Sequence, residues 1–177
     1  MRLFAAVLLT EEQRTALLAY QRALKKSVPP EERVNWSREE NLHLTLAFIG
    51  EYPEAGPVIR ALERVEGEAY SLTLDGGGHF GDIRWVGVRD GGGTVRLAGE
   101  VRRALLEAGI PFDPKPVKPH ITVARKYRGG EPASMPKPVC GEIGAFVLMR
   151  SDRIDGRLTY TKIWEKKLDR HARDQKE

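Results

Sequence analysis

The sequence predicts a single α+β domain over residues 1–177. The length lies in the range of roughly 100–200 residues that is usual for one domain. Segments with the periodicity of strands alternate with segments of helical periodicity, and no long linker separates them. The longest apolar runs fall well short of the roughly 18 residues that a membrane-spanning helix requires. The single cysteine, Cys140, excludes an internal disulfide and a thiolate-rich zinc site. We therefore expect a cytoplasmic monomer that does not associate with membranes.

The N-terminal elements are a strand and a capped helix. Residues 2–9 form an apolar run typical of a buried strand, and this run leads into a helix start rather than a signal-peptide cleavage site. Thr10 and Gln13 have the spacing of a capping box. The helix is expected to end at Pro29-Pro30. Its apolar residues share one face: Leu17, Tyr20 and Leu24.

Two more helices are predicted in the middle of the chain. Apolar residues at helical spacing predict one helix over Val58–Val65, with Gly67 as its stop. The other follows three consecutive glycines, with Thr94 as a candidate cap and Gly109 at its end. The apolar face of this third helix consists of Leu97, Val101 and Leu105.

Four further strands are predicted from alternating or apolar segments bounded by turn residues. Their ranges are Tyr70–Leu74, Ile83–Val88, Ile143–Met149 and Leu158–Trp164. Residues 75–78, Asp-Gly-Gly-Gly, are expected to form a turn between the first two. Asp155-Gly156 marks a turn between the last two, in a loop expected to exceed two residues. The proline-rich residues 111–119 predict an extended approach to the next strand, and the charged residues 169–177 a frayed tail.

Positive charge is concentrated in the last third of the chain. Lys and Arg total 29 against 25 acidic residues, a net charge of +4. Residues 1–110 carry a net −2, whereas residues 111–177 carry +6. Five basic residues lie between positions 115 and 128 with no acid among them: Lys115, Lys118, Arg125, Lys126 and Arg128. Such a stretch suits an anionic partner, for example phosphate, although taken alone it favours a solvated basic face.

A short internal repeat points to chemistry. Residues 43–47, His-Leu-Thr-Leu-Ala, recur as residues 120–124, His-Ile-Thr-Val-Ala. Side chains two apart on a strand share a face, so each histidine projects together with a threonine. Because imidazole titrates near pH 6.5, one histidine can be neutral while another is protonated. Such a pair can take a proton from water and give one to a leaving oxygen, while the two hydroxyls bind a phosphate without any metal.

Other interpretations of the histidines exist. Either copy of the repeat alone favours a half-buried histidine on a strand surface, and it is the recurrence in one frame that favours a shared site. A metal site would need a third ligand. His79, in a glycine-rich segment, is the nearest candidate for that ligand, and His171 in the charged tail is given no role.

The sequence resembles the two-histidine (2H) phosphoesterases, specifically the LigT-like RNA 2′,3′-cyclic phosphodiesterases, formerly called 2′-5′ RNA ligases. The matching stretches are RLFAA at residues 2–6, WSREENLHLTLAFIGE at 36–51, IRWVGV at 83–88, KPVKPHITVAR at 115–125, and the segment around Tyr160-Thr161. The resemblance implies a bilobal fold with pseudo-two-fold symmetry. Each lobe would be an antiparallel sheet flanked by helices, and a central cleft would carry one motif from each lobe.

The resemblance also implies an activity: opening of a 2′,3′-cyclic phosphate at an RNA end to leave a 2′-phosphate, without a cofactor. The position of His43 matches the proton donor to the departing 3′ oxygen, and that of His120 matches the base that activates water. Thr45, Thr122 and Arg125 match positions that hold the phosphate. In-line attack requires donor and base on opposite sides of phosphorus, which two lobes across a cleft would supply.

For residues that flank the two copies of the repeat, the sequence predicts side-chain placement only in part. On a regular strand Arg125 would point away from the second histidine, so a strand end or its long side chain would have to bring it into the cleft. Phe48 and Trp85 are expected in the core. Lys115 and Lys118 either add positive potential for RNA or are simply solvated.

Alternative substrates and one alternative class of function stay open. The substrate could be a small cyclic nucleotide or an ADP-ribose cyclic phosphate, and the reverse reaction would be 2′-5′ ligation. A non-catalytic RNA-binding module would instead use the basic residues 115–128. A protein with the 2H fold could also act on none of these.

Overall fold

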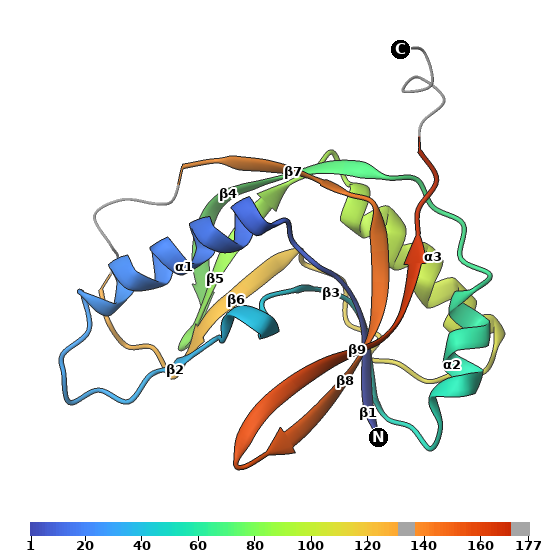
Figure 1. Ribbon diagram of the computed structural model, residues 1–177, viewed down its shortest axis with the longest axis horizontal. Coiled ribbons are helices and arrows are strands. Elements are labelled where there is room, and N and C mark those ends of the chain that lie inside the picture. Colours follow the sequence, from blue (N-terminus) through green and yellow to red (C-terminus); the bar gives the residue numbers. More distant parts are fainter. Residues whose placement is uncertain (131–136, 171–177) are drawn as a thin grey trace.

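The computed structural model describes residues 1–130 and 137–170. Within these residues the chain forms two antiparallel β-sheets and three α-helices (Figure 1), so the α+β prediction is confirmed. The helices are α1 (Glu11–Lys25), α2 (Ala55–Leu62) and α3 (Gly93–Glu107), with a 3-10 turn η1 (Glu39–Asn41). The strands are β1 (Arg2–Val7), β2 (Asn35–Trp36), β3 (Leu44–Glu51), β4 (Tyr70–Phe80), β5 (Ile83–Arg89), β6 (His120–Arg125), β7 (Val139–Ile143), β8 (Ala145–Ile154) and β9 (Arg157–Lys167). In the described part of the chain, none of the helices has the length and apolar character to span a membrane.

The four-stranded sheet has the order β3-β1-β8-β9 and is buried on both faces over much of β1. Leu3 and Ala5 face the main core, which includes residues of α2 and α3. Phe4 and Ala6 point the other way, into a second, smaller apolar cluster with residues of β8. Burial on both sides explains why residues 2–9 are apolar throughout instead of alternating with polar residues.

The five-stranded sheet has the order β2-β6-β5-β4-β7, and α1 packs against β6 and β7. Two buried glutamines of α1 attach the helix to this sheet. The Nε2 of Gln13 donates to the carbonyl oxygen of Leu72 at 2.9 Å, and the Nε2 of Gln21 donates to that of Val123 at 2.8 Å. These hydrogen bonds satisfy both buried side-chain amides, and the Val123 carbonyl also accepts from the Ser37 amide at 3.0 Å. Gln21 therefore fixes α1 against the strand that carries the second motif.

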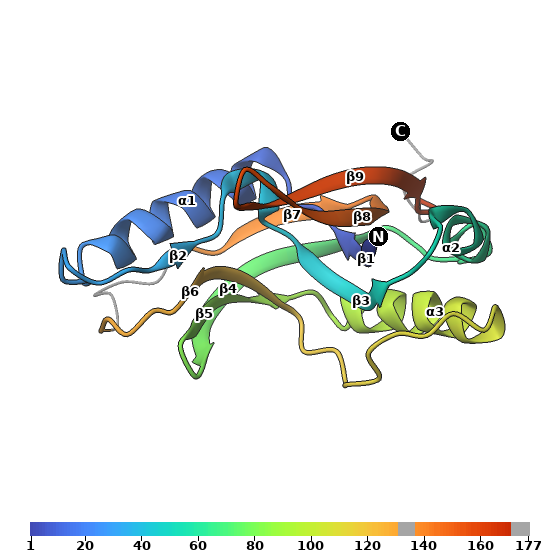
Figure 2. The same cartoon turned by 90° about the horizontal axis from the view of Figure 1, so that it is seen from below.

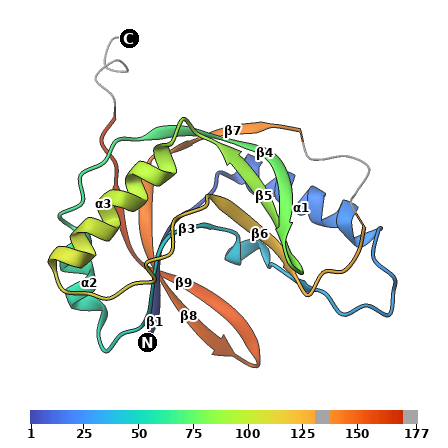
Figure 3. The same cartoon turned by 180° about the vertical axis from the view of Figure 1, so that it is seen from behind.

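Two lobes meet at the centre of the molecule. Figure 2 shows α1 at one end and α2 and α3 at the other. Strands β3 and β6, one from each sheet, contact each other between them (Figure 3). The two copies of the histidine repeat lie on these strands, so the bilobal arrangement brings them to one junction.

The helix starts show which local predictions hold. The capping box of α1 is confirmed, because Thr10 Oγ1 accepts from the Gln13 amide at 3.2 Å and Gln13 Oε1 accepts from the Thr10 amide at 3.1 Å. Helix α2 begins and ends three residues earlier than predicted, with Pro57 in its first turn, where the missing N–H costs nothing.

The predicted cap of α3 is wrong. The N-cap residue is Gly92, and the carboxylate of Asp90 accepts from the amides of Gly92 and Thr94 at 2.9 and 3.0 Å. Thr94 is buried inside the helix, and its hydroxyl bonds the hydroxyl of Tyr70 at 2.9 Å. Gly109 follows the helix end with a φ of +70°, as predicted for a C-terminal glycine.

Two predicted turns are also corrected. Residues 75–78 are not a turn but belong to β4, with an irregular register between Leu74 and Gly77. The glycine there serves packing, because a Cβ on Gly78 would lie 2.6 Å from the ring of Trp85. The β8–β9 loop has only two residues, since Ile154 pairs with Arg157, and Asp155 and Gly156 both have positive φ. This is the pattern of a type I′ turn.

Backbone hydrogen bonds hold part of the proline-rich segment and the first residue of the predicted tail in place. Residues 111–119 contain no helix, as predicted, and the Asp113 amide donates to the carbonyl of Phe48 at 2.8 Å. Asp169 is not frayed, because its amide donates to the Gly67 carbonyl at 2.9 Å and it forms a bridge with Glu68. The rest of the predicted tail, residues 171–177 with His171, lies outside the described residues.

Candidate active site

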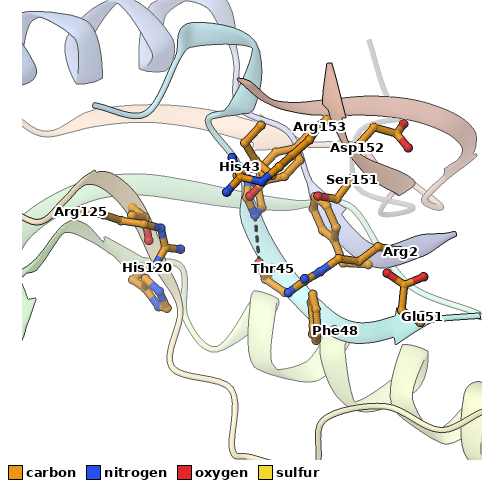
Figure 4. Close-up of a pocket in the computed structure, with 14 residues that line it drawn as sticks. Arg2, His43, Thr45, Phe48, Glu51, His120, Arg125, Ser151, Asp152 and Arg153 are labelled. Carbon is orange, nitrogen blue, oxygen red and sulfur yellow. Dashed lines mark hydrogen bonds between the residues drawn. The ribbon is translucent and has the colours of Figure 1, made fainter. Parts of the chain in front are cut away.

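The four residues predicted from the repeat, and Arg125, which the family resemblance implied, line one cleft of about 610 Å³ between the lobes (Figure 4). They are His43, Thr45, His120, Thr122 and Arg125. His43 directly precedes β3, and His120 begins β6. Strand β1, the end of β3 and the β8–β9 hairpin contribute the rest of the lining: Arg2, Phe4, Phe48, Glu51, Ser151, Asp152, Arg153, Leu158 and Tyr160.

A β-bulge explains why Arg125 reaches this cleft. Thr122 pairs with Trp85 and Ala124 pairs with Arg84, so Val123 is an extra residue on β6. Val123 and Ala124 are consequently both buried, and the alternation resumes one residue later. Arg125 then lies on the same face as the second motif. A bulge beside a functional site commonly re-aims a side chain in this way.

The first copy of the repeat contains the same irregularity. On β3, Thr45 pairs with Ala6 and Ala47 pairs with Ala5, which leaves Leu46 as the extra residue. Leu46 and Ala47 are both buried. The repeat therefore extends to backbone geometry, and Phe48 in the first lobe occupies the position that Arg125 occupies in the second. Phe48 was expected in the core, but it lines the cleft.

Both imidazoles are held by the same kind of contact. The Nδ1 of His43 lies 2.7 Å from the carbonyl oxygen of Asn41, and the Nδ1 of His120 bonds the carbonyl oxygen of Lys118. A carbonyl can only accept, so in both rings Nδ1 carries the proton. When an imidazole is neutral, its Nε2 is then an acceptor. The Nε2 of His43 lies 3.0 Å from the Oγ1 of Thr45, as marked in Figure 4.

Aromatic rings enclose His43. The ring centroid of Phe4 lies 4.9 Å from that of His43, and the centroid of Tyr160 lies 5.2 Å away. Burial by this wall lowers the pKa of His43 below its ordinary value of 6.5, because a charged imidazolium loses solvation there. The hydrogen bond to the Asn41 carbonyl opposes this shift, and the nearby charges of Arg125 and His120 add to it. His43 is thus predominantly neutral in the unliganded protein at pH 7.

The surroundings of His120 are more open. Its ring contacts Phe80 and Trp85, with centroids 5.3 and 6.2 Å away. Phe80 is 41% exposed, whereas Phe4 beside His43 is 3% exposed. Trp85, expected in the core, lies on the same face of the sheet as His120, because Trp85 pairs with Thr122 and Gly87 pairs with His120. Water therefore has readier access to His120 than to His43.

Comparison with known proteins agrees with this geometry. Residues 7–89 match the family described as LigT like phosphoesterase. The chain is 34% identical to the RNA 2′,3′-cyclic phosphodiesterase of Thermus thermophilus, over 99% of this chain and 94% of that protein. The chain belongs to the LigT-like phosphoesterases.

A second relative and a solved structure show how far the likeness extends. The chain is 36% identical over 73% of its length to the RNA 2′,3′-cyclic phosphodiesterase of Geobacillus stearothermophilus, but spans only 43% of that longer protein. The crystal structure of E. coli LigT complexed with NADP+ superposes with a TM-score of 0.78 at 30% identity, covering 95% of this chain and 97% of LigT. The expected 2H family and bilobal fold are therefore confirmed, and this LigT-like phosphoesterase is an enzyme, a hydrolase of phosphate esters.

Three residues of this LigT-like phosphoesterase whose roles the sequence left open lie outside the cleft. Lys115 and Lys118 do not line the cleft, although the Lys118 ammonium lies 6.0 Å from the centroid of the Phe80 ring. His79 lies on β4 away from the cleft. Within residues 1–130 and 137–170, no three His, Cys, Asp or Glu side chains are grouped as metal ligands.

Sequence reasoning missed the residues that reach the cleft from other strands. Arg2 comes from β1 and Arg153 from β8; Arg2 begins the matching stretch at residues 2–6, but no role was predicted for either arginine. Phe4 and Tyr160 lie inside stretches that carry the family resemblance, yet no sequence pattern placed them beside His43. Only the pairing of β1, β8 and β9 brings these side chains to the repeat.

Proposed function

We propose that this LigT-like phosphoesterase hydrolyses the 2′,3′-cyclic phosphate at an RNA end to a 2′-phosphate, with His120 as base and His43 as acid. The observation that carries the proposal is the matched pair of imidazoles in one cleft, each with Nδ1 bonded to a carbonyl two residues earlier. With Nδ1 engaged, Nε2 is the nitrogen through which each ring would exchange a proton, and in His43 this atom lies 3.0 Å from the Thr45 hydroxyl. The names of the Thermus and Geobacillus relatives support the choice of substrate.

His120 suits the role of base. Its neutral ring carries the lone pair on Nε2 because Nδ1–H is engaged by the Lys118 carbonyl. The open rim at Phe80 admits the water whose proton Nε2 removes. The water oxygen then forms a bond to phosphorus while the bond from phosphorus to the 3′ oxygen breaks.

His43 suits the role of acid on the opposite side of phosphorus. Its imidazolium, with Nδ1–H held by Asn41, gives the Nε2 proton to the departing 3′ oxygen. Burial lowers the pKa of His43 in the unliganded protein, which works against this role. The negative charge of a bound phosphodiester favours the imidazolium and raises the pKa again, so substrate itself prepares the acid.

Three side chains would hold the phosphate oxygens. The hydroxyls of Thr45 and Thr122 donate from the two motif strands, and Arg125 offers a planar pair of donors from β6. Donors fixed in this way stabilise the charge that grows on the equatorial oxygens in the transition state. These groups supply both the proton transfers and the charge stabilisation, so the proposed reaction is metal-independent.

The experiment is turnover of an RNA oligonucleotide that ends in a 2′,3′-cyclic phosphate, with the product end mapped. We expect a 2′-phosphate. A 3′-phosphate product would overturn the assigned direction of ring opening. Turnover of small cyclic nucleotides but not of RNA ends would replace the substrate, and a 2′-5′-joined product would point to ligation. Binding of RNA without turnover, weakened steeply by salt, would favour the non-catalytic RNA-binding module.

A further inference from the structure

The cleft extends beyond the groups that would hold one phosphate. Its far wall is formed by Arg2 on β1, Phe48 and Glu51 on β3, and residues 151–153 on β8 (Figure 4). Arg125 and His120 lie on the opposite side in the same view. None of the proposed catalytic steps uses this far wall, so its composition needs a separate explanation.

Arg2 supplies a cation at the place where the first copy of the repeat is followed by Phe48 and not by an arginine. Phe48 occupies the position in the first lobe that Arg125 occupies in the second, because both follow a bulged His-x-Thr-x-Ala segment. The guanidinium of Arg2 lies 5.0 Å from the centroid of the Phe48 ring, a cation–π contact. Each lobe therefore presents one guanidinium beyond its own motif, from β6 in one lobe and from β1 in the other.

The charges of the cleft are arranged for an anion at this end as well. Its two carboxylates are engaged by groups that do not line it: Glu51 lies 3.5 Å from the N-terminal amine, and Asp152 lies 2.7 Å from the Nε of Arg150. Within residues 1–130 and 137–170, its three arginines, Arg2, Arg125 and Arg153, form no ion pair with a carboxylate. The lining of the cleft thus keeps unneutralised positive charge at both ends.

One phosphate between the histidines does not account for Arg2. Phe48 follows Thr45 on β3 beyond the bulge at Leu46, and the guanidinium of Arg2 lies over its ring. Figure 4 shows Arg125 beside His120 on one side of the cleft, and Arg2 near Phe48 and Glu51 on the other. Arg125 thus serves the reacting phosphate, whereas Arg2 lies further along the cleft.

We propose that Arg2, held over Phe48, binds the phosphate that joins the terminal nucleotide to its upstream neighbour, so that the cleft selects RNA chains over mononucleoside cyclic phosphates. The inference rests on the proposed function, because it assumes that a cyclic phosphate lies between His43 and His120. It gives a physical reason why an RNA end, which carries a second phosphate, would be a better substrate than a small cyclic nucleotide.

The test compares kcat/KM for uridine 2′,3′-cyclic phosphate with that for the dinucleotide UpU 2′,3′-cyclic phosphate. We expect the wild-type protein to prefer the dinucleotide. Arg2→Ala should reduce the ratio of the two kcat/KM values about tenfold, because a charge-assisted hydrogen bond is lost. It should also flatten the dependence of log kcat/KM for the dinucleotide on log salt by about 0.7, the loss of one phosphate contact on a single strand.

Two controls separate this role from others. Arg64→Ala removes the same charge from an exposed position outside the cleft and should leave the ratio unchanged. A dinucleotide with a neutral methylphosphonate linkage should lose the preference in the wild-type protein, which needs no variant to fold.

The outcomes are distinguishable from those of the proposed function. No turnover of either cyclic phosphate by the wild-type protein would overturn the proposed function itself. Turnover with an unchanged ratio in Arg2→Ala, or no preference of the wild-type protein for the charged linkage, would overturn only the role of Arg2. An equal loss on both substrates would assign Arg2 to the reacting phosphate or to the fold instead.

Discussion

His120 and Arg125 point into the same cleft although they lie five positions apart on one strand. Strict alternation would place them on opposite faces of the sheet. The bulge at Val123 removes that difference by burying two consecutive side chains. A guanidinium is thereby placed beside the imidazole without a loop having to fold back, and strands hold functional groups more precisely than loops.

The first prediction concerns this guanidinium. Arg125→Ala should lower kcat/KM on an RNA 2′,3′-cyclic phosphate by about 10²-fold, since one preorganised donor to the phosphate oxygens is lost. Arg125→Lys should recover part of the loss, because it keeps the charge but not the paired donors. Steady-state kinetics measure both values, and an Arg125→Ala protein with wild-type kcat/KM would exclude Arg125 from phosphate binding.

The position of Arg125 marks the limit of sequence reasoning. The pairs His43–Thr45 and His120–Thr122 were predicted correctly because alternation over two residues is a local property of strands. The bulge depends on how β6 pairs with β5, and no residue type within 120–125 indicates that pairing. A long-range pairing therefore decided where Arg125 points.

The same reasoning applies to the fold. The capping box at Thr10 depends on four consecutive residues, and it was predicted correctly. The glycines at 76–78 predict a turn, because glycine favours turns. In the structure Gly78 instead makes room for the Trp85 ring on the neighbouring strand, a packing reason that sequence alone does not reveal.

The second prediction removes each histidine in turn. His43→Ala and His120→Ala should each lower kcat by about 10²–10⁴-fold, the usual contribution of a general acid or base. Thermal unfolding should show that both variants remain folded, because both imidazoles face the cleft and not the main core. Wild-type hydrolysis by either variant would show that the two-histidine assignment is incorrect.

The third prediction concerns metal dependence. The proposed proton transfers use imidazoles. Hydroxyls and a guanidinium stabilise the negative charge on the phosphoryl oxygens, so no step requires a metal ion. Activity should therefore be unchanged after dialysis against EDTA. Loss of activity on chelation that is restored by an added divalent cation would instead favour a metal site at the histidines.

The fourth prediction follows from the lowered pKa of His43. The acid must be protonated to act, and it is protonated only below its pKa. The high-pH decline of kcat/KM, which reports the free protein, should therefore lie at a lower pH than the high-pH decline of kcat, which reports the complex. The bound phosphate accounts for the difference, because its charge raises the pKa of His43. Coincident declines in the two profiles would mean that substrate does not change the titration of His43.

The fifth prediction tests the cause of that lowered pKa. Tyr160→Ala removes a ring 5.2 Å from the imidazole of His43 but keeps the backbone amide that donates to Asn41 Oδ1 at 3.2 Å. Water can then solvate the imidazolium, so the pKa of His43 should rise toward its ordinary value, and the high-pH decline of kcat/KM should move to higher pH. Tyr160→Phe keeps the ring and should leave the titration in place. NMR titration of the His43 ring protons measures the pKa directly. If the pKa of His43 in Tyr160→Ala is unchanged or lower, the aromatic wall does not desolvate His43. The charges of Arg125 and His120 would then be the main cause of the lowered pKa.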